Sequence, residues 1–396
     1  MSLRWKLAWI RLAGASARVV LATANKVLFR QDSIQRTFRR ILVYRIGNIG
    51  DILVTLPALD AIRARFPDAH ITLLTSPGWP GAPGAAEVLP LGNWFDDLLV
   101  YHTPDVRSWK RRWRLLRRLR EGEFDLFVEL PNQQSRLRDE LRNIMVARLA
   151  GCPWGVGFAV SQQTLFLREQ ALHIPQERES IRIYRSVAGK LGLDAYRNPR
   201  LPVSNTCRKE IAELLRGFGI LENERFVVVH AGAKRQTNQW PLERFASIAD
   251  EIIHHWGTRV VLTGGPSELP LVKQLVSMMR ASPSVLCGEI DLPRMAALLE
   301  RASLYVGNDT GPMHLAAAVG TPVVSIFGAR DFPERWYPGG VGHSVLRHDV
   351  PCSPCFKEVC DQNLICLRAI ETEQVLAAVE RQLKNQEFRC GLGTHA

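Results

Sequence analysis

The chain lacks any uninterrupted apolar run long enough to cross a bilayer, although 46% of its 396 residues are hydrophobic. In the first 30 positions, Arg11, Arg18 and Lys26 break the apolar sequence, whereas a spanning helix needs about 20 predominantly apolar residues. The same charges interrupt the apolar region that a secretory signal requires. We therefore expect neither a spanning helix nor a signal, and a chain long enough for two domains with separate cores.

Acidic residues are scarce at the start of the chain. The first 40 positions hold nine Lys or Arg and one acid, Asp32, so they carry +8 of the net charge of +12. Apolar residues alternate with these cations, which predicts a basic amphipathic extension over residues 1–39 of the kind that lies on an anionic membrane surface. A helix packed on the protein, with its charges in solvent, is the alternative interpretation.

A second acid-free stretch, residues 107–120, contains eight cations. Trp109, Trp113, Leu116 and Leu119 recur at helical spacing, so we expect this stripe to pack inward while the guanidinium groups face out. No helix-turn-helix, zinc-finger or RNA-binding signature accompanies the basic face, and we predict no nucleic-acid partner. An anionic acceptor, a phosphate-rich membrane and simple solvation all stay open as explanations.

Apolar segments alternate with helical patterns along the rest of the chain, an order that predicts doubly wound parallel sheets. One series begins with the apolar segment 41–46 and a second with 226–229, and a loop-rich span at 198–206 separates them. We predict an α/β fold with two Rossmann-like domains, 40–200 and 201–396, that face a central cleft. The second domain ends in a C-terminal helix.

The most specific motif is N-D-T-G-P-M-H at residues 308–314, set between an apolar segment and a run of small residues. The pattern predicts a strand, a polar turn and the start of a helix, which together suit a phosphate or diphosphate. Thr310 adds a hydroxyl, His314 can reach back from the first turn, and Asp309 can accept from a sugar hydroxyl. The motif predicts a site for a group with phosphate and sugar, although Asp309 and Thr310 as plain helix caps is the alternative.

Several motifs in a fixed order resemble glycosyltransferase family 9, the group of bacterial lipopolysaccharide heptosyltransferases. They are GNIGD at 47–51, LPAL at 56–59, HAGA at 230–233, WP at 240–241, GGPSE at 264–268 and NDTGPMHLAAA at 308–318. Ordered motifs of this kind are together far more specific than any one alone. The resemblance implies a GT-B fold with an acceptor-binding N-terminal domain and a C-terminal domain for a nucleotide sugar, usually an ADP-heptose. It also implies transfer with inversion and without metal.

An inverting transfer needs a base for the attacking hydroxyl and support for the leaving diphosphate. Asp51 ends a glycine turn, begins a helix expected to reach Phe66, and occupies the position of the family's catalytic aspartate. A helix cap is the structural alternative for Asp51. The nearby helix N-terminus would favour its ionised form. Gly47 and Gly50 are expected to let the acceptor approach the backbone closely.

For the leaving diphosphate we expect backbone donors at Thr310 and Gly311 and a side-chain donor from His314. Lys234 and Arg235 add cations, so we predict no metal and no cofactor besides the nucleotide-sugar co-substrate. No Asp-x-Asp metal motif stands where the fold would require one.

The resemblance places Glu268 against the nucleoside and Asp309 against hydroxyls of the donor sugar. In one respect the chain departs from the family pattern. Members commonly carry a basic residue two positions before the Trp-Pro pair, where this chain has Asn238. Either Lys234 or Arg235 supplies the missing charge or the donor differs.

Four of the eight cysteines lie close together in the sequence, at Cys352, Cys355, Cys360 and Cys366. Four thiols at this spacing would suit a structural Zn²⁺ or two disulfides. A cytoplasmic enzyme would keep them reduced, and the resemblance implies no catalytic metal at this segment. We favour free or structural thiols, with Zn²⁺ as the alternative.

Together these features predict a cytoplasmic glycosyltransferase, peripheral to the inner membrane, that adds a heptose from ADP-heptose to the lipid-linked, anionic inner core of lipopolysaccharide. A GT-B transferase or epimerase that uses a different nucleotide sugar is the alternative. A nucleic-acid or zinc-dependent scaffold is a third hypothesis, but it leaves the polar turns of the two domains unexplained.

Overall fold

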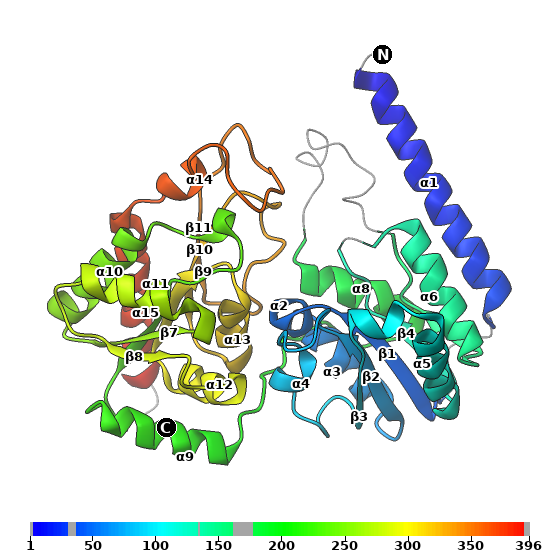
Figure 1. Ribbon diagram of the computed structural model, residues 1–396, viewed down its shortest axis with the longest axis horizontal. Coiled ribbons are helices and arrows are strands. Elements are labelled where there is room, and N and C mark those ends of the chain that lie inside the picture. The colour runs from blue at the N-terminus through cyan, green and yellow to red at the C-terminus, as the bar shows by residue number, and fades with distance from the viewer. Residues whose placement is uncertain (1–2, 31–36, 134, 161–176, 392–396) are drawn as a thin grey trace. The chain divides into compact units, whose positions relative to one another are not determined.

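The computed structural model describes residues 3–30, 37–133, 135–160 and 177–391, and the chain forms two compact units, Met1–Pro199 and Arg200–Ala396 (Figure 1). Each unit contains one sheet in which every strand pair is parallel. Among the residues described, no helix combines the length and apolar character that crossing a membrane requires.

The first unit holds a five-stranded sheet of order β3-β2-β1-β4-β5. The strands are β1 (Arg40–Ile46), β2 (His70–Ser76), β3 (Asp97–Val100), β4 (Leu126–Glu129) and β5 (Trp154–Val156). The helices are α1 (Leu3–Leu28), α2 (Ile49–Leu53), α3 (Leu56–Arg65), α4 (Ala85–Val88), the 3-10 turn η1 (Thr103–Val106), α5 (Trp109–Glu121), α6 (Leu137–Leu149) and α8 (Glu179–Leu191).

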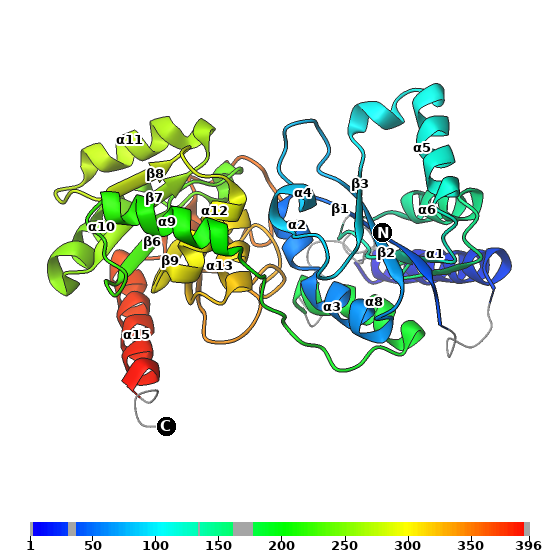
Figure 2. The ribbon, with the colours of Figure 1, turned by 90° about the horizontal axis from the view of Figure 1, so that it is seen from below.

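Helices α1, α5 and α6 cover one face of this sheet, and α3 and α8 pack together on the other (Figure 2). Alternate side chains of β1, such as Leu42 and Tyr44, enter one hydrophobic cluster with Ile144 of α6 and Leu119 of α5. In its C-terminal half α1 buries Leu21 in the same cluster. This half of the basic extension is therefore packed on the protein.

The second unit holds a six-stranded sheet of order β11-β10-β9-β6-β7-β8. The strands are β6 (Phe226–His230), β7 (Arg259–Gly264), β8 (Ser284–Cys287), β9 (Leu304–Asn308), β10 (Val323–Phe327) and β11 (Ser344–Arg347). The helices and 3-10 turns are α9 (Asn205–Gly217), η3 (Gln236–Asn238), α10 (Leu242–Trp256), η4 (Pro266–Glu268), α11 (Leu269–Met278), α12 (Leu292–Arg301), α13 (Gly311–Val319), α14 (Ile365–Arg368) and α15 (Thr372–Gly391).

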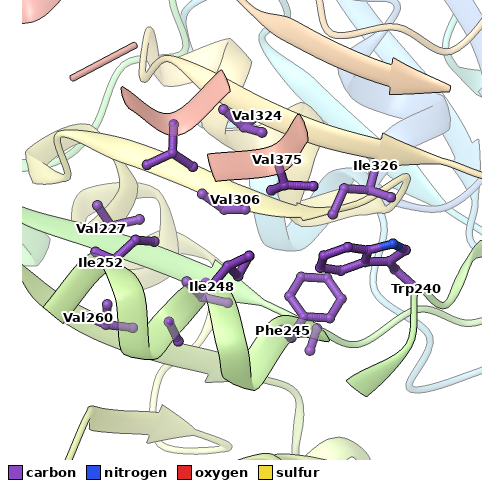
Figure 3. Packing of buried hydrophobic residues seen from close by; sticks show 14 of the residues in the cluster. Val227, Trp240, Phe245, Ile248, Ile252, Val260, Val306, Val324, Ile326 and Val375 are labelled. Carbon is purple, nitrogen blue, oxygen red and sulfur yellow. The ribbon is translucent and has the colours of Figure 1, made fainter. Parts of the chain in front are cut away.

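The main core of the second unit lies between its sheet and the helices α10, α11 and α15 (Figure 3). Ile326 lies beside Trp240, whereas Val227 lies beside Ile252 of α10 at the other end of the cluster (Figure 3). The indole of Trp240 is 2% exposed and its Nε1–H donates to the carbonyl of Ile370. Trp240 thereby fixes the start of α10 and the loop before it, which contributes residues to the site described below.

Two helices differ from the sequence expectation. The helix expected from Asp51 to Phe66 is divided into α2 and α3. Pro57, in the first turn of α3, has no amide hydrogen for a helical bond, so α2 cannot continue through it. The loop expected over 198–206 ends early, because Ser204 caps α9 by accepting the N–H of Cys207 at 3.1 Å.

Helix α5 forms where predicted but does not bury the expected stripe. Leu119 is 1% exposed, whereas Trp109 is 74% and Trp113 51% exposed. The expectation that both tryptophans pack inward is therefore wrong. They lie at the N-terminal end of α5, beyond the part of the helix that enters the hydrophobic cluster.

Candidate active site

In the first unit the candidate catalytic residue Asp51 lies in the first turn of α2, at the third helical position. Its Oδ2 accepts the backbone N–H of Asn48 at 3.1 Å, which makes it a capping residue of α2. Gly47 has φ +144°, and a Cβ at that position would lie 2.2 Å from the Cβ of Asp51. The conformation and the space at Gly47 thus serve to seat the Asp51 side chain. Gly50 lies within α2, where its carbonyl accepts Val54 N–H.

Behind Asp51 lies a buried arginine that the sequence expectation missed. Arg45 is 1% exposed, and its Nε donates to the carbonyl of Asp51 at 3.1 Å while its Nη2 lies 3.9 Å from Asp51 Oδ1. Its Nη1 donates to the carbonyls of Leu130 and Pro131. Burial lowers the pKa of Arg45, and the neighbouring Asp51 carboxylate opposes that shift. A cation within the apolar run of β1 was the signal that could have identified it.

A pair of buried acids lies deeper in the same unit. Glu129 accepts Asn143 Nδ2 at 2.7 Å, and Glu140 accepts the N–H of Ala159 at 3.0 Å. Burial raises the pKa of Glu129 well above its usual range and that of Glu140 to about 7. Arg45 lowers the pKa of Glu129. Arg45 therefore acts on Asp51 directly and partly opposes the rise in the pKa of Glu129.

In the second unit the 308–314 motif forms the strand, turn and helix start that its sequence predicts. Strand β9 ends at Asn308, Thr310 is the N-cap position, and α13 begins at Gly311. Asn308 is fully buried, and its side chain accepts Trp240 N–H at 3.1 Å and donates to Ala231 O at 2.8 Å. These bonds connect the turn to the loop after β6, so two of the predicted donor segments lie together.

Asn238, where the family commonly has a basic residue, contacts Asp309 directly. Its Nδ2 donates to Asp309 Oδ2 at 3.1 Å and to the Asp309 carbonyl at 3.0 Å. Burial and the repulsion of Asp331 raise the pKa of Asp309 to about 7, although Arg330 and Arg235 oppose the shift. The amide thus holds a carboxyl group that gains a proton near neutral pH.

His314 lies in the first turn of α13 and is buried. Burial lowers its pKa to about 4, so the ring is neutral at physiological pH and has one N–H to donate. The ring packs edge-on against Trp336 with centroids 6.1 Å apart. His314 can therefore serve as a neutral hydrogen-bonding group beside the helix N-terminus, and not as a cation.

Glu268 lies at the end of η4, and its carboxylate folds back over two glycines. Its Oε2 accepts Gly265 N–H at 2.7 Å and lies 3.7 Å from His230 Nε2. A Cβ at Gly232 would meet Glu268 Oε1 at 1.9 Å. Burial lowers the pKa of His230, with the Glu268 carboxylate opposing the shift. The ends of β6 and β7 thus place Glu268 beside the segment that carries Lys234 and Arg235.

Two arginines of the second unit, Arg235 and Arg330, pair with the same acidic side chain, Glu358. Arg235 Nε lies 2.8 Å from Glu358 Oε1, and Arg330 Nη2 lies 3.6 Å from the same oxygen. Arg330 Nε also donates to Lys357 O at 3.0 Å. Lys234 is exposed. The sequence expectation missed Arg330, although its place just beyond the carboxyl end of β10 was an available signal.

The clustered cysteines are free thiols in the structure. Cys360 Sγ accepts the N–H groups of Gln362 and Leu364 at 3.3 Å, and Cys360 N–H donates to Gln236. Within the described ranges, no three His, Cys, Asp or Glu side chains gather in a way that could hold a metal ion. The thiols described here support the loop that carries Glu358.

Comparison with known proteins places these features in a family. The family profile of glycosyltransferase family 9 (heptosyltransferase) matches residues 112–365. The lipopolysaccharide heptosyltransferase 3 of Escherichia coli K12 is 27% identical over 362 residues, which cover 84% of this chain and 95% of that protein. The lipopolysaccharide heptosyltransferase 1 of Pseudomonas aeruginosa is 25% identical over 358 residues, with 81% and 87% covered.

Solved structures share the fold. A glycosyltransferase family 9 protein from Veillonella parvula superimposes with a TM-score of 0.74 at 23% identity, over 89% of this chain and all of that one. The ADP-heptose lipopolysaccharide heptosyltransferase II of E. coli superimposes with a TM-score of 0.66 at 21% identity, over 88% and 99%. The two parallel α/β sheets are therefore those of a GT-B glycosyltransferase. The chain belongs to glycosyltransferase family 9.

Proposed function

We propose that this glycosyltransferase transfers a heptose from ADP-heptose to the core of lipopolysaccharide, with inversion and without a metal ion. The observation that carries the proposal is the turn at 308–314, where a helix N-terminus, a neutral histidine and a half-buried carboxyl group with a raised pKa lie together. Such a turn suits a diphosphate joined to a sugar. The relatives named above, which are lipopolysaccharide heptosyltransferases, support the same substrates.

Asp51 is the proposed base. Its carboxylate takes the proton of the acceptor hydroxyl while the hydroxyl oxygen forms the new bond to the anomeric carbon. The bond from that carbon to the diphosphate oxygen breaks, and ADP leaves with the electron pair. The side chain of Asp51 is 25% exposed, so it is open to a substrate, and Arg45 holds it from behind.

The donor is proposed to bind the second unit. The N–H groups of Thr310 and Gly311 and the ring of His314 would receive the diphosphate, and Asp309 would accept from hydroxyls of the sugar. Glu268 would accept from the ribose hydroxyls of the nucleoside. The positive charge that the family commonly has at position 238 would come from other side chains.

Arg330 and Arg235 are the proposed source of that charge, together with Lys234. Both arginines act electrostatically on Asp309, and Glu358 holds them near one another in the donor-free protein. A diphosphate carries the same sign of charge as Glu358 and could take its place between the two guanidinium groups. This arrangement would stabilise the leaving group without Mg²⁺.

The first unit is proposed to bind the acceptor, a lipid-linked and anionic inner core of lipopolysaccharide. We place the enzyme on the cytoplasmic side of the inner membrane, where its basic extension meets anionic lipid. The cations of α5 and the exposed part of α1 support this location.

The deciding experiment offers purified enzyme ADP-heptose, UDP-glucose and GDP-mannose with a deheptosylated core acceptor, in the presence of EDTA. We expect transfer from ADP-heptose alone, and proton NMR of the product should show the anomeric configuration inverted. Transfer from UDP-glucose or GDP-mannose would keep the fold but identify a transferase for another sugar. Nucleotide conversion without transfer would identify an epimerase.

A further inference from the structure

Three neighbouring helices of the first unit expose apolar side chains. Helices α1 and α5 both contact α6, and we call them together the α1–α6–α5 layer. On α5 the exposed residues are Trp109 and Trp113, and on α6 they are Met145, at 57%, and Leu149, at 52%. The exposed residues of α1 are Val19, Val20, Val27 and Leu28. Eight large apolar side chains thus lie in solvent on the helices of one layer.

The two tryptophans form an ordered pair. Their positions differ by four, so they lie on one ridge of α5, and their rings stack with centroids 6.3 Å apart and planes at 22°. Arg117 lies four positions further along the same ridge and is exposed. In the loop before α4, Trp79 is 54% exposed and lies 4.9 Å beneath the guanidinium carbon of Arg107. Indole rings and cations are therefore interleaved over this part of the unit.

The layer has a net positive charge, most of it on α5, while α6 carries three arginines and the two acids Asp139 and Glu140. Helix α5 carries seven cations and one acid, Glu121, a net charge of +6. Lys110, Arg114 and Arg118 are exposed. In the described half of α1, Arg18 and Lys26 are exposed beside the valines. A surface with this charge attracts an anionic partner.

The kind of side chain decides between the anionic partners. Nucleic acid would use the cations and could stack on the tryptophans, but it has no use for exposed valine, leucine and methionine. A bilayer surface binds all three kinds of side chain. Aliphatic groups enter the boundary of the acyl chains, indole rings lie among the headgroups, and cations bind the phosphates. We propose that the α1–α6–α5 layer docks on an anionic bilayer, with Trp109 and Trp113 as its interfacial anchors.

This inference deepens the proposed function, because it assigns the face by which an enzyme for a lipid-linked acceptor approaches its substrate. Docking through helices that cover the sheet requires no spanning segment. The tryptophan pair and the α6 pair belong to separate helices, so their contributions to binding can be tested one at a time.

The test measures cosedimentation of the full chain with vesicles of phosphatidylglycerol and phosphatidylethanolamine, with no donor or acceptor present. We expect the variant W109Q/W113Q to bind roughly tenfold more weakly than wild type. M145Q/L149Q and R114Q/R118Q should each lose affinity in the same direction. Wild-type binding should fall with added salt and with vesicles of phosphatidylcholine alone, because the attraction is screened or removed.

Matched controls lie in the second unit. L221Q/V341Q replaces two side chains that are 64% and 91% exposed, and K209Q/K273Q removes two exposed cations. Both controls should bind vesicles like wild type. Equal binding by W109Q/W113Q and wild type would overturn the proposal. Retention of duplex RNA by wild type, with no sedimentation on vesicles, would overturn it in favour of nucleic acid.

A second readout separates this inference from the proposed function. Turnover of a soluble, acyl-free acceptor should be the same for W109Q/W113Q and wild type, whereas turnover of acceptor embedded in vesicles should fall. If the variant transfers sugar equally well in both assays, the docking proposal is wrong and the transferase proposal stands. If wild type binds vesicles as expected but transfers no heptose, the docking proposal stands and the transferase proposal is wrong.

Discussion

Each unit has one aspartate of the candidate site near the carboxyl end of a parallel strand, and the partners of the two carboxyl groups differ. Asp51 lies in the first turn of α2, after β1, whereas Asp309 lies between β9 and the N-cap of α13. Asp51 is 25% exposed and has the buried Arg45 behind it. Asp309 is bonded to the amide of Asn238, and burial raises its pKa to about 7.

The difference between the partners of Asp51 and Asp309 indicates why one suits the role of a base and the other the binding of a sugar. A carboxylate with a cation behind it and solvent in front is suited to stay ionised and accept a proton in a reaction. A half-buried carboxyl group held by a neutral amide is suited to hydrogen-bond hydroxyls, and it adds little negative charge beside a diphosphate when it is protonated. The predictions below test this contrast.

Exchanging each aspartate should give the largest and most distinct effects. We expect Asp51→Asn to lower kcat by about 10³-fold, because the proton acceptor is lost, while the Kd for ADP-heptose stays within about twofold. Asp309→Ala should instead weaken ADP-heptose binding by roughly tenfold. Release of ADP and calorimetric titration measure the two quantities. Substantial residual kcat in Asp51→Asn would exclude it as the base.

Removing the guanidinium group that lies behind Asp51 should have the next largest effect on kcat. Arg45→Met keeps an unbranched apolar stem but removes the guanidinium group and its bonds to Asp51, Leu130 and Pro131. We expect kcat to fall by about 10²-fold through displacement of the carboxylate. The free energy of unfolding should fall by about 3 kcal/mol, because buried acids lose their counter-charge.

Arg45→Lys is the matched variant, because it keeps the charge and loses the planar fork. It should recover most of the unfolding free energy in a denaturant titration and little of kcat. ADP-heptose binding by either variant should equal that of wild type. A variant Arg45→Met with normal kcat would show that Asp51 needs no support from behind.

A smaller effect is expected on the donor side from Gly232→Ala. The added Cβ would meet Glu268 Oε1 at 1.9 Å, so the carboxylate must turn away. We expect ADP affinity to fall roughly tenfold, with kcat at saturating donor nearly unchanged. Gly189→Ala is the control, since nothing lies within 4 Å of the Cβ that it would gain. Equal calorimetric affinities for the two variants would contradict the assignment of Glu268.

The smallest expected effect is a pH dependence due to Asp309. Its pKa of about 7 in the folded state exceeds the ordinary value of 3.8, so the folded state binds the proton more tightly than the unfolded chain. The free energy of unfolding should therefore fall as the pH rises from 3.8 to about 7. Once ionised, Asp309 also repels the diphosphate of the donor. ADP-heptose, whose diphosphate has no titrating terminal group, should therefore bind roughly threefold more tightly at pH 6 than at pH 8. Asp309→Asn should remove this dependence in calorimetry, and a persisting dependence would implicate another group.

Strong local patterns allowed the sheets and turns to be predicted, while contacts between distant segments could not be. Strands such as β6 and β9 are apolar runs between polar turns, and the helix at 311–319 begins at its glycine as expected. The edge strands β5 and β11 were not predicted, because β5 is three residues long with a central glycine and β11 follows a glycine-rich segment and includes polar residues. The break before α3 required attention to one proline.

The candidate site, like the fold, was predicted where a local sequence motif marks it. The residues that carry a motif, such as Asp51 and Asp309, could be proposed from sequence. Arg45 and Arg330 occupy positions that could have drawn attention to them, but their roles and that of Glu358 depend on contacts across 6 to 123 positions of the chain, which the sequence does not show. The exposure of Trp109 likewise depends on where α5 leaves the core, which helical periodicity does not reveal.

The carboxylate of Glu358 has a consequence for the entropy of donor binding. Arg235 and Arg330 are long side chains that would otherwise sample many rotamers in solvent. Because both arginines pair with Glu358, the entropic cost of ordering them belongs to folding and not to ligand binding. A diphosphate that replaces Glu358 would then meet two arginines already in place, while the energy of parting them from Glu358 keeps product release from becoming too slow.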